Sequence, residues 1–175
     1  QIDKKTDSPD EDKSISDSKS LKPVLTDFFN LHPDFKPHTF LGDSIFDTCD
    51  TYTLLLDEFK FQRALIPLNS RNSNLDLPPV EYNDDGWPLC FKDPSITLKP
   101  FGWTREEGRS DRFKWRCPHV KRINGKWITS CENPCNGKPC GRVVHTSPAL
   151  DKRMYPGEIR GSDKWISDYK IRVVV

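Results

Sequence analysis

A strand, a helix and a second strand follow one another between residues 37 and 68, and this series constrains the fold more than any other feature. The run at residues 38–41 predicts a short strand, and the mostly apolar run at residues 61–68 predicts another. Ser44 or Asp47 can cap the helix between them. Its apolar residues recur at helical spacing: Ile45, Cys49, Tyr52, Leu56 and Phe59. A βαβ unit of this length implies parallel strands and a right-handed crossover, which makes the chain an α/β protein.

The segments on either side of this unit differ in character. Residues 1–20 are charged and Ser-rich with almost nothing apolar, which predicts a flexible lead-in. Residues 21–31 predict a helix with one broad apolar face. Near the other end, Ser162 can cap a final helix that still runs at Val175. Three residues share one face of that helix: Trp165, Tyr169 and Val173.

The middle of the chain is rich in Pro, Asn, Gly, Trp and Cys and shows little helical period, which indicates a β-rich insertion. Asn124-Gly125 is a hairpin-turn signal. The candidate strands are residues 96–98, 113–116, 127–129 and 141–146. We therefore expect four segments: the lead-in (1–20), a core portion (21–72), a Cys-rich β insertion (73–140), and a return strand with the final helix (141–175).

Five of the six cysteines lie in this insertion. Four thiolates that converge tetrahedrally would bind a structural zinc ion and stabilise a loop-rich module. Disulfides or reduced thiols are the alternatives, and the lack of a secretion signal argues against disulfides. Cys49, outside the insertion, is expected to be a small buried hydrophobe. The zinc would take four of these five residues: Cys90, Cys117, Cys131, Cys135 and Cys140.

The charge of the chain is nearly balanced, at +1, but its distribution is uneven. Lys and Arg are dense between residues 92 and 126, which is compatible with nucleic-acid binding, although a solvated surface explains the same pattern. No segment approaches the roughly 20 consecutive apolar residues that cross a bilayer. We therefore expect no membrane partner and a cytoplasmic location.

Asp43 directly follows the first predicted strand. In a parallel sheet this is the carboxyl end of a strand, where open α/β folds bind ligands. A carboxylate there can hold Mg²⁺ or Mn²⁺, and two such ions can promote phosphodiester chemistry. One aspartate is not sufficient for that chemistry, and spacing alone favours a simple helix-start residue.

Two motifs in this region resemble a known family. Residues 42–48 (GDSIFDT), followed by residues 64–72 (ALIPLNSRN), resemble the second-acid region of bacterial insertion-sequence DDE transposases. Further segments resemble the Cys-containing insertion of one subgroup and the helix that leads to the last catalytic acid; they are residues 84–90, 112–118 and 141–146, and residues 160–172. The resemblance covers about residues 21–175.

The resemblance implies an incomplete ribonuclease H-like fold (helix, strand, helix, strand, final helix) with a β-rich Cys-containing insertion. A complete enzyme of this family binds two Mg²⁺ ions with three acids and carries out DNA cleavage and strand transfer. By position Asp43 matches the second acid, and Asp47 supports the helix start. The first acid is expected upstream and the third, a Glu, just after Val175, because Glu158 lies too early. We therefore expect a chain truncated at both ends and inactive alone.

The same resemblance implies transposon-end DNA as the partner, a homo-oligomer of the parent enzyme, and a nucleoid-associated location in a bacterium. The alternative is a non-catalytic, zinc-stabilised module that binds DNA or another partner. For most of the tryptophans in the insertion, core packing is expected in place of base stacking. The candidate DNA-binding residues are Arg71, Lys114, Arg116, Lys121, Arg122 and Arg172.

Overall fold

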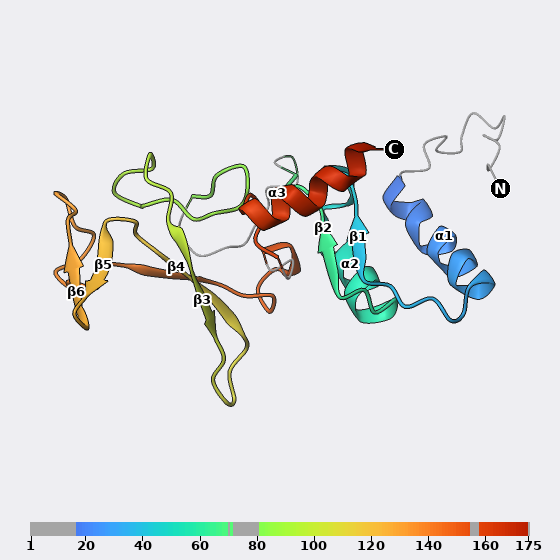
Figure 1. Cartoon of the computed structure of the whole chain (residues 1–175), viewed down its shortest axis with the longest axis horizontal. Coiled ribbons are helices and arrows are strands. Elements are labelled where there is room, and N and C mark those ends of the chain that lie inside the picture. Colours follow the sequence, from blue (N-terminus) through green and yellow to red (C-terminus); the bar gives the residue numbers. More distant parts are fainter. Residues whose placement is uncertain (1–16, 70, 72–80, 155–157, 175) are drawn as a thin grey trace, which may run out of the picture.

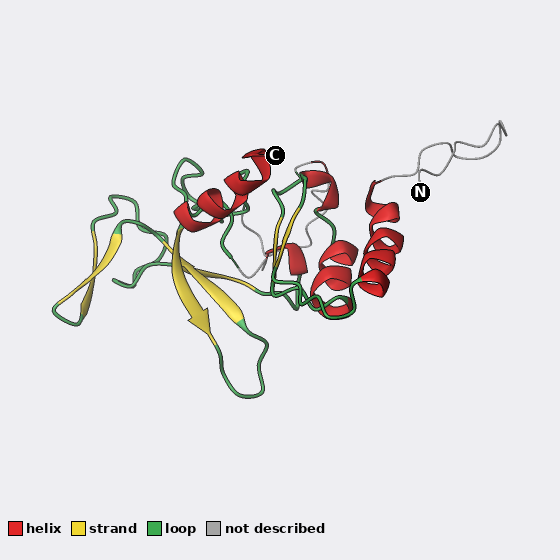
Figure 2. Cartoon of the chain, turned by 45° about the vertical axis from the view of Figure 1, so that its right-hand side comes forward, coloured by secondary structure: helices red, strands yellow, loops and turns green. Residues whose placement is uncertain are grey.

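The computed structural model of the chain describes residues 17–69, 71, 81–154 and 158–174, and it shows a mixed α/β architecture. The molecule is elongated, with a two-stranded hairpin at one end and the first helix at the other (Figure 1). The strands form three separate sheets, and most of the helices lie towards the right-hand side of the view in Figure 2. Within the described residues, no helix is both long and apolar enough to cross a membrane.

The predicted βαβ unit is present. Strands β1 (Thr39–Leu41) and β2 (Arg63–Leu65) pair in parallel, with Phe40 opposite Ala64. Both strands are shorter than the sequence predicts. The connection between them contains three helical pieces: the 3-10 turn η1 (Ser44–Phe46), the α-helical turn α2 (Cys49–Tyr52) and the π-helical turn η2 (Thr53–Glu58).

The connecting helix differs in phase from the prediction. Neither Ser44 nor Asp47 is its cap; the cap is Thr48, whose hydroxyl accepts from the amide of Thr51 at 3.1 Å. The chain passes from a 3-10 turn to an α turn and then to a π turn, so no single 3.6-residue period runs through it. Ile45 and Cys49 are consequently exposed, and the expectation that Cys49 is a buried hydrophobe is wrong.

Helix α1 (Asp17–Leu31) begins inside the segment that was expected to be a flexible lead-in. Pro23 therefore lies in the helix interior. Leu21 of α1 is buried against the βαβ unit, and Leu25 packs beside it. The buried members of this first core are Leu21, Tyr52, Leu54, Leu55, Ala64 and Ile66.

A second, antiparallel sheet has the strand order β3-β4-β7, formed by Lys99–Thr104, Arg112–Arg116 and Val143–Thr146. The strand expected to return to the first sheet is β7, and it pairs with β4 instead. Residues 96–98 form no strand; Thr97 makes only an isolated bridge with Leu89. The buried members of this second core are Cys90, Leu98, Phe113, Trp115 and Val144.

The hairpin at the end of the molecule consists of β5 (Val120–Ile123) and β6 (Lys126–Thr129). Its turn is the predicted Asn124-Gly125 pair, and both residues have positive φ, 48° and 79°. These angles fit the tight turn that matches the twist of paired strands, which favours Asn-Gly. The turn signal therefore predicted the hairpin, although β5 itself was not expected as a strand.

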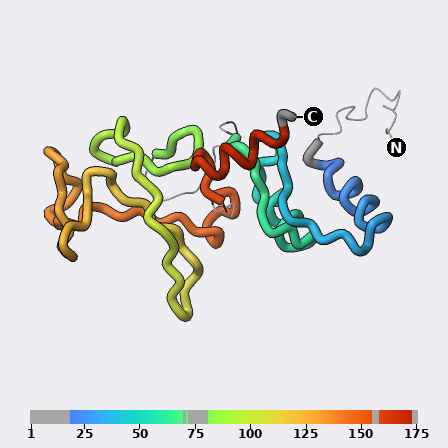
Figure 3. Tube along the Cα trace, viewed as in Figure 1, coloured from blue at the N-terminus to red at the C-terminus, as the bar shows by residue number. Residues whose placement is uncertain are grey.

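The last part of the chain returns to the βαβ unit, as the tube in Figure 3 shows. It contains η4 (Lys152–Met154), α3 (Asp163–Tyr169) and the 3-10 helix η5 (Lys170–Val174). Ser162 caps α3 as predicted, because its hydroxyl accepts from the amide of Trp165 at 3.2 Å. The expected end of this helix, Val175, lies outside the described residues.

Candidate functional site

Asp43 lies at the carboxyl end of β1, as the sequence predicts. The amide of Gly42 donates to the carbonyl of Leu65 at 3.1 Å, which extends the β1–β2 pairing by one residue. Asp43 then has an extended backbone, and its carbonyl accepts from the amide of Phe46 in η1 at 3.0 Å. The side chain of Asp43 is 59% exposed. Its carboxylate is therefore accessible at the edge of the parallel pair.

Arg172 of η5 pairs with this carboxylate. Its two terminal nitrogens donate to the two carboxylate oxygens of Asp43, and one of them also donates to the hydroxyl of Tyr169 at 2.7 Å. The Tyr169 hydroxyl donates to the carbonyl of Gly42 at 3.0 Å. The hydrogen bond from Arg172 and its positive charge hold the pKa of Asp43 below its ordinary value. The final helix is thus attached to the strand end that carries Asp43.

The described residues do not fit a complete Mg²⁺ site around Asp43. No group of three or more His, Cys, Asp or Glu side chains among them is spaced to hold a metal ion. The single carboxylate of Asp43 also carries a guanidinium partner. Glu158 does not complete the set. It pairs with Arg63 at 3.7 Å, and Arg63 is the first residue of β2. Glu158 therefore lies towards the amino end of the parallel strands, whereas Asp43 lies at their carboxyl end.

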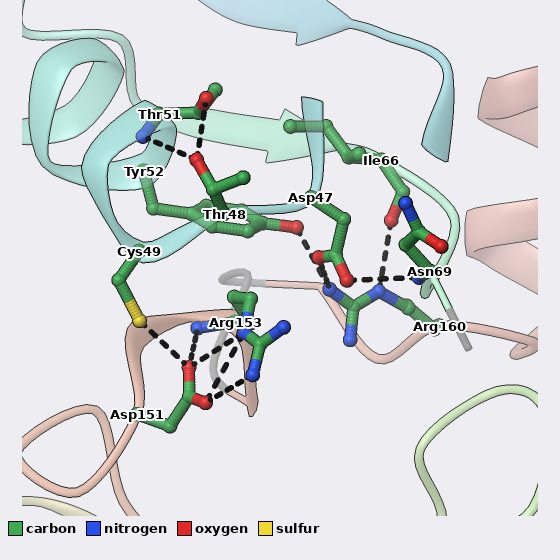
Figure 4. A network of polar contacts seen from close by, with 10 residues as sticks. All are labelled: Asp47, Thr48, Cys49, Thr51, Tyr52, Ile66, Asn69, Asp151, Arg153 and Arg160. Carbon is green, nitrogen blue, oxygen red and sulfur yellow. Dashed lines mark hydrogen bonds and ion pairs between the residues drawn. The ribbon is translucent and has the colours of Figure 1, made fainter. Parts of the chain in front are cut away.

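Asp47, the second aspartate of the motif, is buried and serves the packing of the fold (Figure 4). Its carboxylate accepts from Arg160 at 2.7 Å and from the amide of Asn69 at 2.9 Å. The Arg160 guanidinium also donates to the hydroxyl of Tyr52 and to the carbonyl of Ile66, both at 2.8 Å. Asp47 therefore joins the helical connection to the chain after β2, in place of capping a helix.

Burial dominates the titration of this network. It raises the pKa of Asp47, against the opposing effect of the Arg160 charge and the Asn69 amide. It also raises the pKa of Tyr52 to about 12. Neither side chain is accessible for proton exchange with a substrate. We therefore assign a structural role to both Asp47 and Tyr52.

A second carboxylate–guanidinium pair lies beside this network, as the left part of Figure 4 shows. Asp151 accepts from the Arg153 guanidinium at 2.8 Å and from the Arg153 amide at 2.8 Å. The thiol of Cys49 donates to Asp151 at 3.2 Å. The exposed Cys49 is therefore a hydrogen-bond donor to Asp151, the residue before η4, which explains its place outside the apolar core.

One face of β4 is basic. Phe113 and Trp115 point into the second core, so the three residues that alternate with them share the opposite face. These residues are Arg112, Lys114 and Arg116. The register places His145 of β7 beside Lys114. Arg112 belongs to the basic segment at residues 92–126 but not to the predicted DNA-binding residues, although the Arg-x-Lys-x-Arg alternation at residues 112–116 contains the signal.

This face continues onto the hairpin through an aromatic stack. The guanidinium carbon of Arg116 lies 3.9 Å from the ring centroid of Trp127 and 4.5 Å from that of Phe101. Arg122 also approaches the Trp127 ring, at 5.8 Å. Lys121 and Arg122 are exposed on β5. The exposed Phe101 was not predicted; it lies at an irregularity in the β3–β4 register between Pro100 and Gly102.

The structure thus divides the candidate DNA-binding residues. Lys114, Arg116, Lys121 and Arg122 lie on β4 and β5 at one end of the molecule. Arg172 is engaged by Asp43, and Arg71 follows β2, where its amide donates to the Asn69 side chain at 3.0 Å. We therefore call Arg112, Lys114, Arg116 and Arg122 the basic face, in which Arg112 also pairs with Glu106 at 3.1 Å. Lys121 alternates with Arg122 along β5 and points to the opposite face of the hairpin.

The insertion cysteines are also divided. All six thiols are free of disulfides. The sulfurs of Cys90 and Cys135 lie 3.3 Å apart, and Cys117 lines the same small cavity. The thiol of Cys140, in contrast, contacts the carbonyl of the next residue, Gly141, at 3.7 Å.

Comparisons with protein-family models, with curated proteins and with solved structures give no match for this chain.

Proposed function

We propose that this chain is part of the catalytic domain of a DDE transposase, in which Asp43 is one of the acids for Mg²⁺-dependent DNA cleavage and strand transfer. The observation that carries the proposal is the position of Asp43: an exposed carboxylate at the carboxyl edge of a parallel βαβ unit. Ligands of open α/β folds bind at this edge. Transposon-end DNA is the proposed substrate, and a homo-oligomer is the proposed assembly.

The contacts of Asp43 fit an ionised, oriented metal-binding carboxylate that lacks further acids beside it among the described residues. Arg172 keeps the carboxylate ionised and fixes its direction. One carboxylate with a guanidinium partner is a poor site for a hard divalent cation, which takes several oxygen ligands. We therefore expect this chain alone to be inactive, and further acids to be required for chemistry.

The test uses the complete product of the gene that encodes this chain. Cleavage of transposon-end DNA is measured with Mg²⁺ for the wild type, for Asp43→Asn and for Asp34→Asn, an exposed acid in the loop after α1. Asp43→Asn is expected to abolish cleavage, and Asp34→Asn to preserve it. Normal cleavage by the Asp43 variant would contradict the proposal. Efficient cleavage by residues 1–175 alone with Mn²⁺ would contradict the incomplete acid set.

The second candidate function is DNA binding without catalysis, and the basic face favours it. Three cations alternate on β4, of which Arg112 pairs with Glu106 at 3.1 Å. Arg116 packs against the rings of Trp127 and Phe101, and Phe101 is half exposed. Lys and Arg bind phosphates and release counterions, so the affinity for duplex DNA should fall as salt rises. A titration at two salt concentrations tests this function, and absence of binding at low salt would contradict it.

A further inference from the structure

Four cysteines from three separate chain segments converge between the second sheet and the hairpin. Cys90 follows the bridge at Leu89, Cys117 directly follows β4, and Cys131 and Cys135 follow β6. In a tetrahedral zinc–thiolate site with bonds of about 2.3 Å, two sulfurs lie roughly 3.8 Å apart. In a disulfide they lie about 2.05 Å apart. The 3.3 Å contact between Cys90 and Cys135 is thus nearer to the zinc geometry.

The other two thiols lie close to this pair. Cys117 lines the same cavity as Cys90 and Cys135. Cys131 directly follows Ser130, whose amide donates to the carbonyl of His119 at 2.9 Å. His119 lies two residues after Cys117, so the backbone holds the segment of Cys131 next to the segment of Cys117.

A lysine holds two of the segments together. The ammonium of Lys92, two residues after Cys90, donates to the side chain of Asn133 at 3.0 Å and to the carbonyl of Pro134 at 2.9 Å. Both acceptors lie in the loop between Cys131 and Cys135. Arg142 lines the cavity from β7's side. These two cations would offset part of the charge of a site with four thiolates.

We infer that Cys90, Cys117, Cys131 and Cys135 bind one structural Zn²⁺ ion. Thiolates are soft ligands that select zinc over Mg²⁺ or Ca²⁺. On binding, each thiol releases its proton to solvent and the sulfur donates an electron pair to the metal, so four protons are released and nothing is oxidised or reduced. As the described side chains stand, no three of them are spaced around an ion, so the thiols must rotate inward to bind it.

The ion would connect two parts that the strands leave separate. The β5–β6 hairpin forms a sheet of its own, apart from β3-β4-β7. Zinc at the ends of β4 and β6 would fix the hairpin, and with it Trp127, against the sheet. The inference does not depend on the transposase proposal, because it concerns a different part of the chain and a different metal.

The test begins with the wild-type chain, purified under reducing conditions from zinc-replete medium. We expect one zinc per chain by elemental analysis, and X-ray absorption is expected to show four sulfurs at about 2.3 Å from the metal. This measurement needs no variant, so it cannot be confused with misfolding. Zinc-free protein with six free thiols would overturn the inference, as would a zinc bound mainly through nitrogen or oxygen.

Single Cys→Ser variants then identify the ligands. In competition with a chromophoric chelator, Cys117→Ser and Cys131→Ser are expected to bind zinc at least tenfold more weakly than the wild type. The matched controls are Cys140→Ser and Cys49→Ser, whose thiols lie outside the cluster, and both are expected to retain full affinity. Equal loss in the controls, or a Cys90–Cys135 disulfide in the purified chain, would overturn the assignment.

Discussion

The guanidinium of Arg160 donates to the carboxylate of Asp47 at 2.7 Å, and the side chains of the two residues are 3% and 0% exposed. The backbone of Arg160 also reaches the second core, because its carbonyl accepts from the indole nitrogen of Trp87 at 2.6 Å. Arg160 therefore connects the βαβ unit with the second sheet. Its position 113 residues from Asp47 makes this a contact of the tertiary fold.

Replacement of Arg160 by Met should strongly destabilise the fold. The variant leaves the Asp47 carboxylate buried without its charged partner, which typically costs about 3–5 kcal/mol. The free energy of unfolding is measured by urea denaturation. The control is Lys22→Ala, which removes an exposed ion pair with Glu58 and should cost less than about 1 kcal/mol. If the two variants lose similar free energies of unfolding, the buried Arg160–Asp47 pair stabilises the fold no more than an exposed ion pair does.

Acidification should remove the contribution of the Asp151 carboxylate to the free energy of unfolding. Burial raises the pKa of this carboxyl, but hydrogen bonds from Arg153 and Cys49 lower it more, and the net pKa is lowered. The unfolded chain therefore takes up the proton first, at the ordinary pKa of about 3.9. The stabilisation is complete above that pH and is lost as the pH falls through the lowered pKa of the folded state.

Denaturation at about pH 6 and about pH 3 measures this contribution, and Asp151→Asn should lose less stability between the two than the wild type does. The comparison cancels the other acids, which titrate in both proteins. Asp50→Asn, an exposed acid near Cys49, is the control and should behave as the wild type. If Asp151→Asn loses as much stability as the wild type, the assignment of the lowered pKa is wrong.

Removal of Arg172 should change the titration of Asp43. Without the hydrogen bonds and charge of the guanidinium, the pKa of Asp43 should rise towards its ordinary value. NMR titration of the Asp43 carboxyl in Arg172→Ala measures the shift. Lys170→Ala, an exposed neighbour in the same 3-10 helix, should leave the pKa unchanged. An unchanged pKa in Arg172→Ala would mean that the pair does not persist in solution.

Removal of a single charge from the basic face should weaken DNA binding in a salt-dependent way. Lys114→Ala and Arg122→Ala should each reduce the slope of log affinity against log salt by about 1, because each removes one phosphate contact. Lys19→Ala on α1, at the opposite end of the molecule, should leave the slope unchanged (Figure 1). Slopes that match the wild type in Lys114→Ala and Arg122→Ala would place DNA elsewhere on the chain.

Local sequence signals predicted much of the fold. The βαβ series, the Asn124-Gly125 turn and the Ser162 cap depend on residues that are neighbours in the chain, and the structure contains all three. The predicted phase of the connecting helix was wrong because it assumed one regular period, whereas the chain changes from a 3-10 to an α and then to a π turn. A period measured over the whole segment cannot detect such changes.

The remaining features depend on distant residues. The partner of β7 is β4, and neither strand carries a signal that specifies the other. The pairing of Arg172 with Asp43 joins residues 129 positions apart. Arg172 was therefore assigned to DNA on its charge alone. Sequence spacing likewise left Cys135 and Cys140 equivalent as zinc ligands, and only the fold separates them.

The central claim is that the Asp43 carboxylate is a metal ligand for DNA cleavage, and a ligand substitution tests it most directly. Asp43→Cys, in the complete gene product, replaces the hard oxygen ligand with a soft sulfur, which Mn²⁺ accepts more readily than Mg²⁺ does. We predict that this variant fails to cleave transposon-end DNA with Mg²⁺ and recovers cleavage with Mn²⁺, whereas Asp43→Ala recovers with neither ion. Cleavage by Asp43→Cys at the wild-type rate in Mg²⁺, or equal recovery of both variants in Mn²⁺, would contradict the claim.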